Sequence, residues 1–122
     1  MARVEVRNVS KVYPDGTIAV HDLNLEIESG EFLCVLGPSG CGKSSTLRML
    51  AGLEQVSEGA ILVNGEDVVN VPARDRDIAM VFENYALYPH LDVFDNIAMP
   101  LVARKTDKPE IERRVREIAG TL

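Results

Sequence analysis

Residues 37–45 read Gly37-Pro38-Ser39-Gly40-Cys41-Gly42-Lys43-Ser44-Ser45. Two glycines with four residues between them, followed by Lys and Ser, form the pattern of a loop that binds nucleotide phosphates. Residues without a Cβ atom allow successive backbone N–H groups to converge on one anion. Lys43 is expected to reach the β- and γ-phosphates, and Ser44 to ligate Mg²⁺. The stretch therefore predicts a site for a nucleoside triphosphate.

The residues on either side of this loop support the prediction. Residues 32–36 (FLCVL) form an unbroken apolar run, which is typical of a strand that is buried on both faces. A helix is expected to begin near Lys43, where the positive end of its dipole would lie beneath the phosphates. Gly52 is placed to end this helix. One face of the helix is expected to carry Leu47, Leu50, Ala51 and Glu54.

Composition and charge narrow the possible classes of protein. Of the 122 residues, 46% are hydrophobic and 26% are charged, which is typical of a globular domain without low-complexity segments. The net charge of −6 argues against nucleic acid as a main partner. No apolar stretch approaches the length of about 18 residues that crosses a bilayer, so a membrane role would require a membrane-spanning partner. Cys34 and Cys41 match neither a metal-binding nor a disulfide spacing, so both are expected to be free thiols in a cytosolic protein.

Several other elements can be placed from periodicity and turn residues. Alternating apolar residues predict half-buried antiparallel strands near residues 2–7 and 23–28, and a further buried strand is predicted at 78–82. Asn64-Gly65 after an apolar run is a strong hairpin signal. Other turns are predicted at Pro14-Asp15-Gly16 and at Ser29-Gly30.

The last part of the chain is predicted to be helical. Asp92 can cap a short helix over residues 93–99, which Pro100 is expected to close. Pro109 can occupy the first turn of a second helix. The apolar residues of that second helix recur at helical intervals, and they are Ile111, Val115, Ile118 and Leu122.

Residues 76–90, RDIAMVFENYALYPH, resemble the ATP-binding subunits of ABC transporters. Together with Tyr13-Pro14-Asp15-Gly16, the loop at 37–45 and Ala51-Gly52-Leu53-Glu54, they are similar to the importers of carbohydrates and glycerol-3-phosphate. The resemblance implies an α/β fold of the P-loop NTPase type, with an N-terminal antiparallel β subdomain and a truncated helical subdomain. It divides the chain into an antiparallel β region (1–30), a P-loop core (31–90) and the start of a helical subdomain (91–122).

The same resemblance implies roles for individual residues. Tyr13 would stack on the adenine of ATP, although a lone aromatic beside a turn is also an ordinary hairpin residue. The segment that follows Phe82 corresponds to the family's Q-loop, which senses the γ-phosphate. Its contact with transmembrane permease subunits would be made by Ala86, Leu87, Tyr88 and Pro89, which without the resemblance read as a loop packed on its own domain. The expected nucleotide contacts are Tyr13, Gly37, Pro38, Ser39, Gly40, Cys41, Gly42, Lys43, Ser44 and Ser45.

Glu83 departs from the family, which has Gln at this position. A carboxylate about 4 Å from a phosphate oxygen is repelled by up to about 4 kcal/mol at an effective dielectric constant of about 20, unless Mg²⁺ lies between them. Ser44 and Glu83 are therefore the expected Mg²⁺ ligands, with Glu83 otherwise turned away or protonated. An alternative treats residues 79–83 as the strand and the Mg²⁺-water carboxylate of a generic P-loop enzyme. His90 is not expected to be a catalytic base.

The expected function is that of an ATP-binding subunit that energises ABC-type import of a carbohydrate or related solute. It would form a homodimer with a second ATP-binding subunit, peripheral to the cytoplasmic face of the cell membrane. The 122 residues contain no Leu-Ser-Gly-Gly-Gln signature and no later Asp-Glu motif. The alternative is thus a truncated nucleotide-binding fragment, and ATPase activity is expected of a complete subunit rather than the isolated chain. A GTP-binding switch is set aside because no Asn-Lys-x-Asp tetrapeptide occurs.

Overall fold

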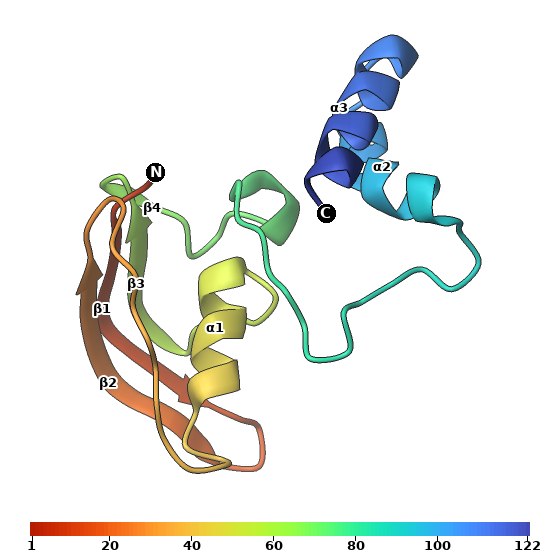
Figure 1. Ribbon diagram of the computed structural model, residues 1–122. Helices are drawn as coiled ribbons and strands as arrows, with labels where there is room; N and C mark the ends of the chain where they lie inside the picture. Colours follow the sequence, from red (N-terminus) through yellow and green to blue (C-terminus); the bar gives the residue numbers. More distant parts are fainter. The chain divides into compact units, whose positions relative to one another are not determined.

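The computed structural model describes residues 1–122, and the chain divides into two compact units (Figure 1). The first unit, Met1–Met80, contains all the strands and one α-helix, and the second, Val81–Leu122, contains the other two α-helices. Neither unit has a helix with the length and apolar character needed to span a membrane. The three-part division at residues 30/31 and 90/91 stays a prediction.

A four-stranded antiparallel sheet forms the first unit, in the order β2-β1-β3-β4. Its strands are β1 (Val4–Val12), β2 (Ile18–Ile27), β3 (Glu58–Val63) and β4 (Glu66–Asp67). β1 lies between β2 and β3, and its first residue, Val4, pairs with Ile27 on one side and with Val63 on the other. The predicted antiparallel strands at the start of the chain are therefore confirmed, and each is longer than its alternating pattern indicated.

The turns of this sheet follow the residues that predicted them. The N–H of Gly16 donates to the carbonyl of Tyr13 at 2.9 Å, and Gly16 has a φ of 85° that suits glycine. Asn64 and Gly65 form the two-residue hairpin between β3 and β4, with φ values of 52° and 84°. The N–H of Glu31 donates to the carbonyl of Glu28 at 3.0 Å across the turn at residues 29–30. All three predicted turns are thus confirmed.

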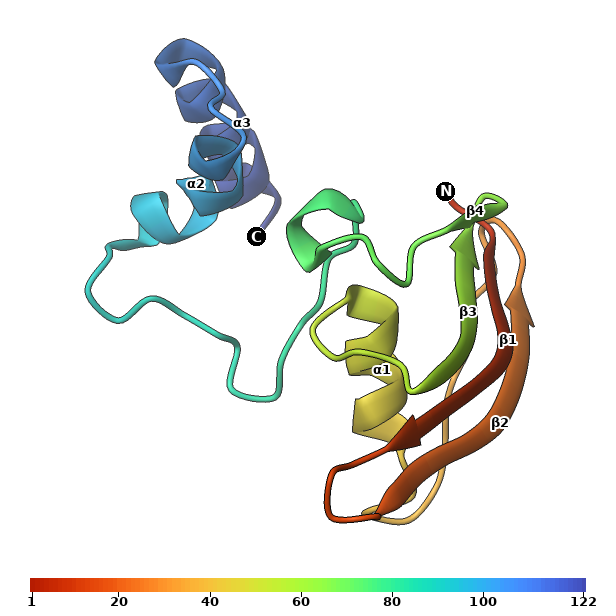
Figure 2. The same ribbon diagram turned by 180° about the vertical axis from the view of Figure 1, so that it is seen from behind.

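Figure 2, seen from behind, shows α1 (Lys43–Ala51) beside the sheet, and the core of this unit contains buried residues of both. Met49 of α1 is 1% exposed and packs with Val9 and Ile61 of the sheet. Of the predicted apolar face, Ala51 is buried and Leu50 packs against the core, but Leu47 is 48% exposed. The buried residues of the helix are Thr46, Met49 and Ala51, so the buried face is centred nearer Met49 than the pattern predicted.

Residues 32–36 and 78–82 are not strands, and both predictions of buried strands are wrong for this structure. Phe32 is 92%, Leu36 85% and Val81 88% exposed. A strand buried on both faces needs hydrogen-bonded neighbours, and the sheet of the first unit pairs only β1 to β4. Cys34 is consequently exposed rather than buried, although both cysteines are free thiols as predicted.

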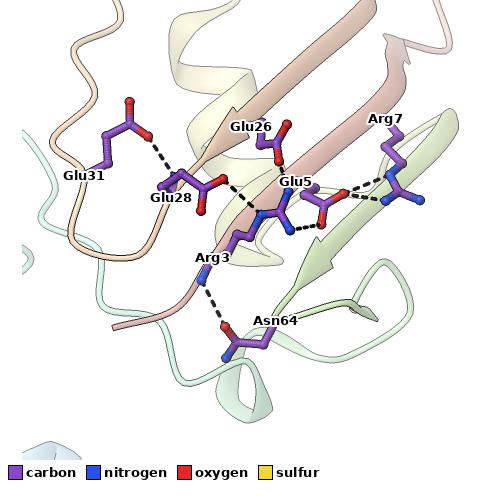
Figure 3. Close-up of polar contacts among 7 residues, drawn as sticks. All are labelled: Arg3, Glu5, Arg7, Glu26, Glu28, Glu31 and Asn64. Atoms are coloured by element: carbon purple, nitrogen blue, oxygen red, sulfur yellow. Dashed lines mark hydrogen bonds and ion pairs between the residues drawn. The ribbon is translucent and has the colours of Figure 1, made fainter.

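A polar network covers the outer surface of the sheet (Figure 3). Arg3 forms ion pairs with Glu5, Glu26 and Glu28, and its N–H donates to Oδ1 of Asn64 at 3.0 Å. Beyond these, Arg7 donates to Glu5, and Glu31 accepts from the N–H of Glu28. The hydrogen bond from Arg7 lowers the pKa of the Glu5 carboxyl. Because most of these side chains are exposed, solvent screens the ion pairs and each is expected to contribute little to stability.

The second unit contains α2 (Val93–Ala103) and α3 (Lys108–Thr121), which pack through Ala98, Ile111 and Val115. Asp92 caps α2 as predicted, since its side chain accepts from the N–H of Asp95 at 2.8 Å. Pro109 lies in the first turn of α3, which is also as predicted.

The predicted end of α2 at Pro100 is wrong, because the helix continues to Ala103. Proline removes one helical hydrogen bond, but Leu101 beyond it packs on the α2–α3 core and supports the extra turn. The N–H of Arg104 donates to the carbonyl of Pro100 at 3.3 Å, which keeps that carbonyl paired at the helix end.

Candidate nucleotide-binding site

The glycine-rich loop enters α1 through Gly42, which is the N-cap residue and has a φ of 89°. A Cβ atom at this position would lie 2.3 Å from the carbonyl oxygen of Ala19 in β2. Both the backbone angle and the contact therefore require glycine. Gly42, at the end of the loop, therefore packs directly against the backbone of β2, and this contact fixes the start of the helix.

Lys43 turns its side chain back into the loop. Its Nζ donates to the carbonyl of Gly37 at 2.5 Å and to that of Pro38 at 2.7 Å, and it lies 3.4 Å from Sγ of Cys41. Neutral carbonyls are weaker acceptors for an ammonium than phosphate oxygens are. The charge is therefore held at the loop by partners that an anionic ligand can outcompete.

The N-terminus of α1 is electrostatically open to an anion. It has no side-chain cap and no acidic residue in its first turn, whereas α2 has Asp95 and α3 has Glu110 in theirs. The unpaired N–H groups and the dipole of such a terminus favour a negative ligand. Residues 37–41 and Ser44 are exposed, so the loop and the Ser44 hydroxyl are accessible from solvent.

Tyr13, from the turn after β1, is close to the first turn of α1. Its hydroxyl lies 3.2 Å from Oγ of Ser45, within hydrogen-bond distance, and its side chain is half-buried. The structure thus brings together Tyr13 and Ser45 from two separate parts of the sequence. An aromatic ring beside a phosphate-type loop is placed where a nucleotide base could reach it.

Glu83 and the predicted permease contact belong to the second unit. Glu83 is exposed in a turn that is closed by the N–H of Tyr85 and the carbonyl of Phe82 at 3.0 Å. Tyr85 and Ala86 then adopt left-handed backbone angles, with φ values of 60° and 49°, which are unusual for residues with side chains. Ser44 and Glu83 lie in different units, so their joint role as Mg²⁺ ligands stays a prediction.

The four predicted permease-contact residues, Ala86, Leu87, Tyr88 and Pro89, are all exposed. The conformation of the loop after them depends on Asn96 of α2. The Asn96 amide donates to the carbonyls of Tyr88, Leu91 and Asp92, and its Oδ1 accepts from the N–H of Tyr88 at 2.9 Å. His90 makes an edge-on ring contact with Tyr88 at 6.1 Å. This loop is therefore held by a helix side chain, while its apolar residues face outward.

Sequence reasoning missed three residues that organise these loops: Lys11, Arg76 and Asn96. Arg76 is only 7% exposed, and its guanidinium donates to the carbonyls of Met49, Leu50, Val69 and Val71 at 2.8–3.1 Å. Burial lowers the pKa of Arg76. The one signal in the sequence was an Arg-Asp pair before an apolar run, which does not reveal that the partners of Arg76 are backbone carbonyls. The structure has no cluster of three or more His, Cys, Asp or Glu residues suited to a metal ion.

Comparison with known proteins is consistent with the geometry of this site. Residues 20–122 match the family model described as "ABC transporter". The whole chain is 53% identical to the oligosaccharides import ATP-binding protein MsmX of Bacillus subtilis and covers 33% of it. It is 52% identical to the sn-glycerol-3-phosphate import ATP-binding protein UgpC of Cupriavidus metallidurans, again over the whole chain and 33% of that protein. The chain thus spans about a third of the length of these relatives.

Among solved structures, the fold is similar to the ATP-binding cassette MJ0796, solved as a dimer in a post-hydrolysis state with ADP and Pi. The TM-score is 0.83 at 29% identity, and the match covers 93% of this chain and 54% of MJ0796. The similarity therefore extends over nearly all of the elements described above.

Proposed function

Because the chain belongs to the ABC transporter family, we propose that it binds MgATP through residues 37–45 and helps to energise solute import. The observation that carries the proposal is the loop itself, in which the Lys43 ammonium and the uncapped N-terminus of α1 lie together. The import of a carbohydrate or related solute is proposed from the relatives, whose names describe importers of oligosaccharides and glycerol-3-phosphate.

Each residue of the site has a proposed role. Lys43 exchanges the loop carbonyls for phosphate oxygens, and the remaining loop residues present their N–H groups to the same anion. Ser44 offers its hydroxyl to Mg²⁺, which would neutralise phosphate charge when bound. The donor set fits that ion, because Mg²⁺ prefers oxygen ligands and usually takes only one or two of them from the protein. Tyr13 provides a ring for the adenine base.

The exposed residues 86–89 are the proposed contact with a transmembrane permease. Exposed apolar side chains such as Leu87 (68%) and Tyr88 (44%) are consistent with a surface that another protein covers. The protein would act as a homodimer at the cytoplasmic face of the membrane, as MJ0796 is a dimer.

The test is a titration of the 122-residue chain with MgATP by isothermal titration calorimetry. Lys43→Met is expected to lower the affinity at least about tenfold, because a phosphate would lose a charge-assisted donor. Lys108→Met is the matched control, since it removes the same charge from the exposed start of α3. Equal affinities in Lys43→Met and Lys108→Met would contradict the proposed site.

A further inference from the structure

Lys11, near the end of β1, makes three contacts that hold its charged group in place. Its Nζ donates to the carbonyl of Gln55 at 2.8 Å and lies 3.4 Å from Oε1 of Glu54. It also lies over the ring of Tyr13, 5.0 Å from the ring centroid. The side chains of Lys11 and Glu54 are only 13% and 17% exposed, so this ion pair is much better shielded than the other pairs on the sheet.

The Tyr13 ring is consequently held at two points. Its hydroxyl lies against Ser45 in the first turn of α1, and one of its faces lies beneath the Lys11 ammonium. Glu54 and Gln55 follow the end of the same helix, so both ends of α1 take part in fixing the ring. Lys11 lies near the end of β1 and Tyr13 directly follows the strand, so the two residues are spaced i, i+2 and the ammonium lies over the ring.

A shielded lysine beside an aromatic ring has a specific physical effect. The ring quadrupole attracts the ammonium, and this attraction strengthens when both groups are removed from water. Glu54 compensates the charge, which would otherwise be costly to bury. The ammonium also occupies one face of the ring, which leaves only the opposite face for a planar ligand.

We propose that Lys11, with Glu54 as its counter-ion, is a positioning residue that orients Tyr13 for stacking on the nucleotide base through the ring face opposite the ammonium. This inference rests on the proposed function, because it presupposes that MgATP binds beside residues 37–45. Lys11 itself does not contact the phosphates. Its effect is on the base, and it is therefore separable from the effect of Lys43.

The test compares the affinities of the 122-residue chain for two ligands, MgATP and magnesium tripolyphosphate. Tripolyphosphate lacks the base. Lys11→Met keeps the aliphatic stem and removes the charge. It is expected to weaken MgATP binding about threefold to tenfold and to leave tripolyphosphate affinity within about twofold. Lys11→Arg retains a cation over the ring and is expected to restore the affinity for MgATP. Lys108→Met serves as the control for the lost charge.

A Tyr13→Leu background separates positioning from a general loss of stability. On that background Lys11→Met is expected to cause no further loss of MgATP affinity, because no ring remains to be oriented. All titrations are run well below the unfolding temperature of each variant. The proposal would be overturned if Lys11→Met lowered the affinities for MgATP and tripolyphosphate by equal factors. It would also be overturned if Lys11→Met lowered the affinity for MgATP equally with Tyr13 and with Tyr13→Leu.

The outcome also distinguishes this inference from the proposed function. If the unmodified chain binds neither MgATP nor tripolyphosphate, the proposed nucleotide site is wrong, and the proposed role of Lys11 is wrong as well. If the unmodified chain binds both ligands and Lys11→Met leaves the ratio of the two affinities unchanged, only the positioning role is overturned.

Discussion

A Cβ atom on Gly52 would lie 2.5 Å from Nε of Arg76 and 2.8 Å from its Cζ. Gly52 ends α1 with a φ of 75°, and the guanidinium beside it donates to the carbonyls of Met49 and Leu50. A cation at this point pairs with the negative end of the helix dipole. The absence of a side chain at Gly52 is therefore what admits Arg76 to the end of the helix.

Gly52→Ala is expected to destabilise the chain more than a glycine substitution that only strains the backbone. The left-handed angle alone costs roughly 1–2 kcal/mol for alanine, and displacement of Arg76 adds to this because its carbonyl partners lose a donor. We expect a total of about 2–4 kcal/mol, measured as the free energy of unfolding in urea.

Gly65→Ala is the matched control for this experiment. Gly65 has a φ of 84°, but a Cβ atom there would meet nothing within 4 Å. The difference between the two variants isolates the contact with Arg76. Equal losses of stability would mean that the guanidinium can move aside at no cost.

The chain's exposed apolar residues predict self-association of the isolated 122-residue polypeptide. Phe32 (92% exposed) and Val81 (88%) lie in extended segments whose backbone groups have no strand partner. Replacing both by Ser is expected to reduce association, as measured by analytical ultracentrifugation over a concentration series. Val93→Ser, at an exposed position of 76% within a helix, is the control. A monomeric unmodified polypeptide with a cooperative melt would contradict the prediction.

Elements built from neighbouring residues could be predicted from the sequence, and elements that depend on distant partners could not. The turns at Gly16 and Gly65 and the cap at Asp92 follow from local backbone chemistry. Residues 32–36 have the composition of a buried strand, but composition does not supply the neighbour that such a strand needs.

The same distinction applies to the site. The glycine spacing predicts a phosphate-binding loop, because the motif is contiguous in sequence. The contacts of Lys11 with Glu54 and of Arg76 with Met49 join residues far apart in the chain, and no local pattern indicates them.

Glu83→Gln is expected to raise the ATPase turnover of a complete subunit. Glu83 has a carboxyl group where the resemblance implies the neutral amide of Gln, and a carboxylate near the γ-phosphate would be repelled unless a metal ion intervenes. We therefore expect that Glu83 weakens the response to the γ-phosphate. Steady-state phosphate release at saturating MgATP measures the effect, with Glu112→Gln on the exposed surface of α3 as control. Unchanged turnover would show that this hypothesis is wrong.

Acid is expected to weaken α3 through Glu110. Hydrogen bonds from Arg113 and Arg114 lower the pKa of the Glu110 carboxyl from 4.5 to about 2. Because the folded state favours the carboxylate, this contribution is complete above the unfolded pKa of 4.5 and is lost as the pH falls toward about 2. Far-ultraviolet circular dichroism across this range measures it.

Glu110→Gln is expected to flatten the acid dependence of helicity, because it removes the titrating group. Glu112→Gln lies on a different face of the same helix and is expected to leave the acid dependence of helicity unchanged. A Glu110→Gln curve that follows the unmodified chain throughout would assign the acid sensitivity to other carboxylates.

The contacts at the two ends of α1 have a consequence for the length of the helix. Gly42 abuts the Ala19 carbonyl and Gly52 abuts Arg76, and neither position has space for a methyl group. One inserted residue would turn the far end of the helix by about 100° and advance it by about 1.5 Å, so both contacts could not persist. The nine residues from Lys43 to Ala51 therefore form a helix of fixed length. Substitutions within it are expected to be tolerated far better than insertions or deletions of residues.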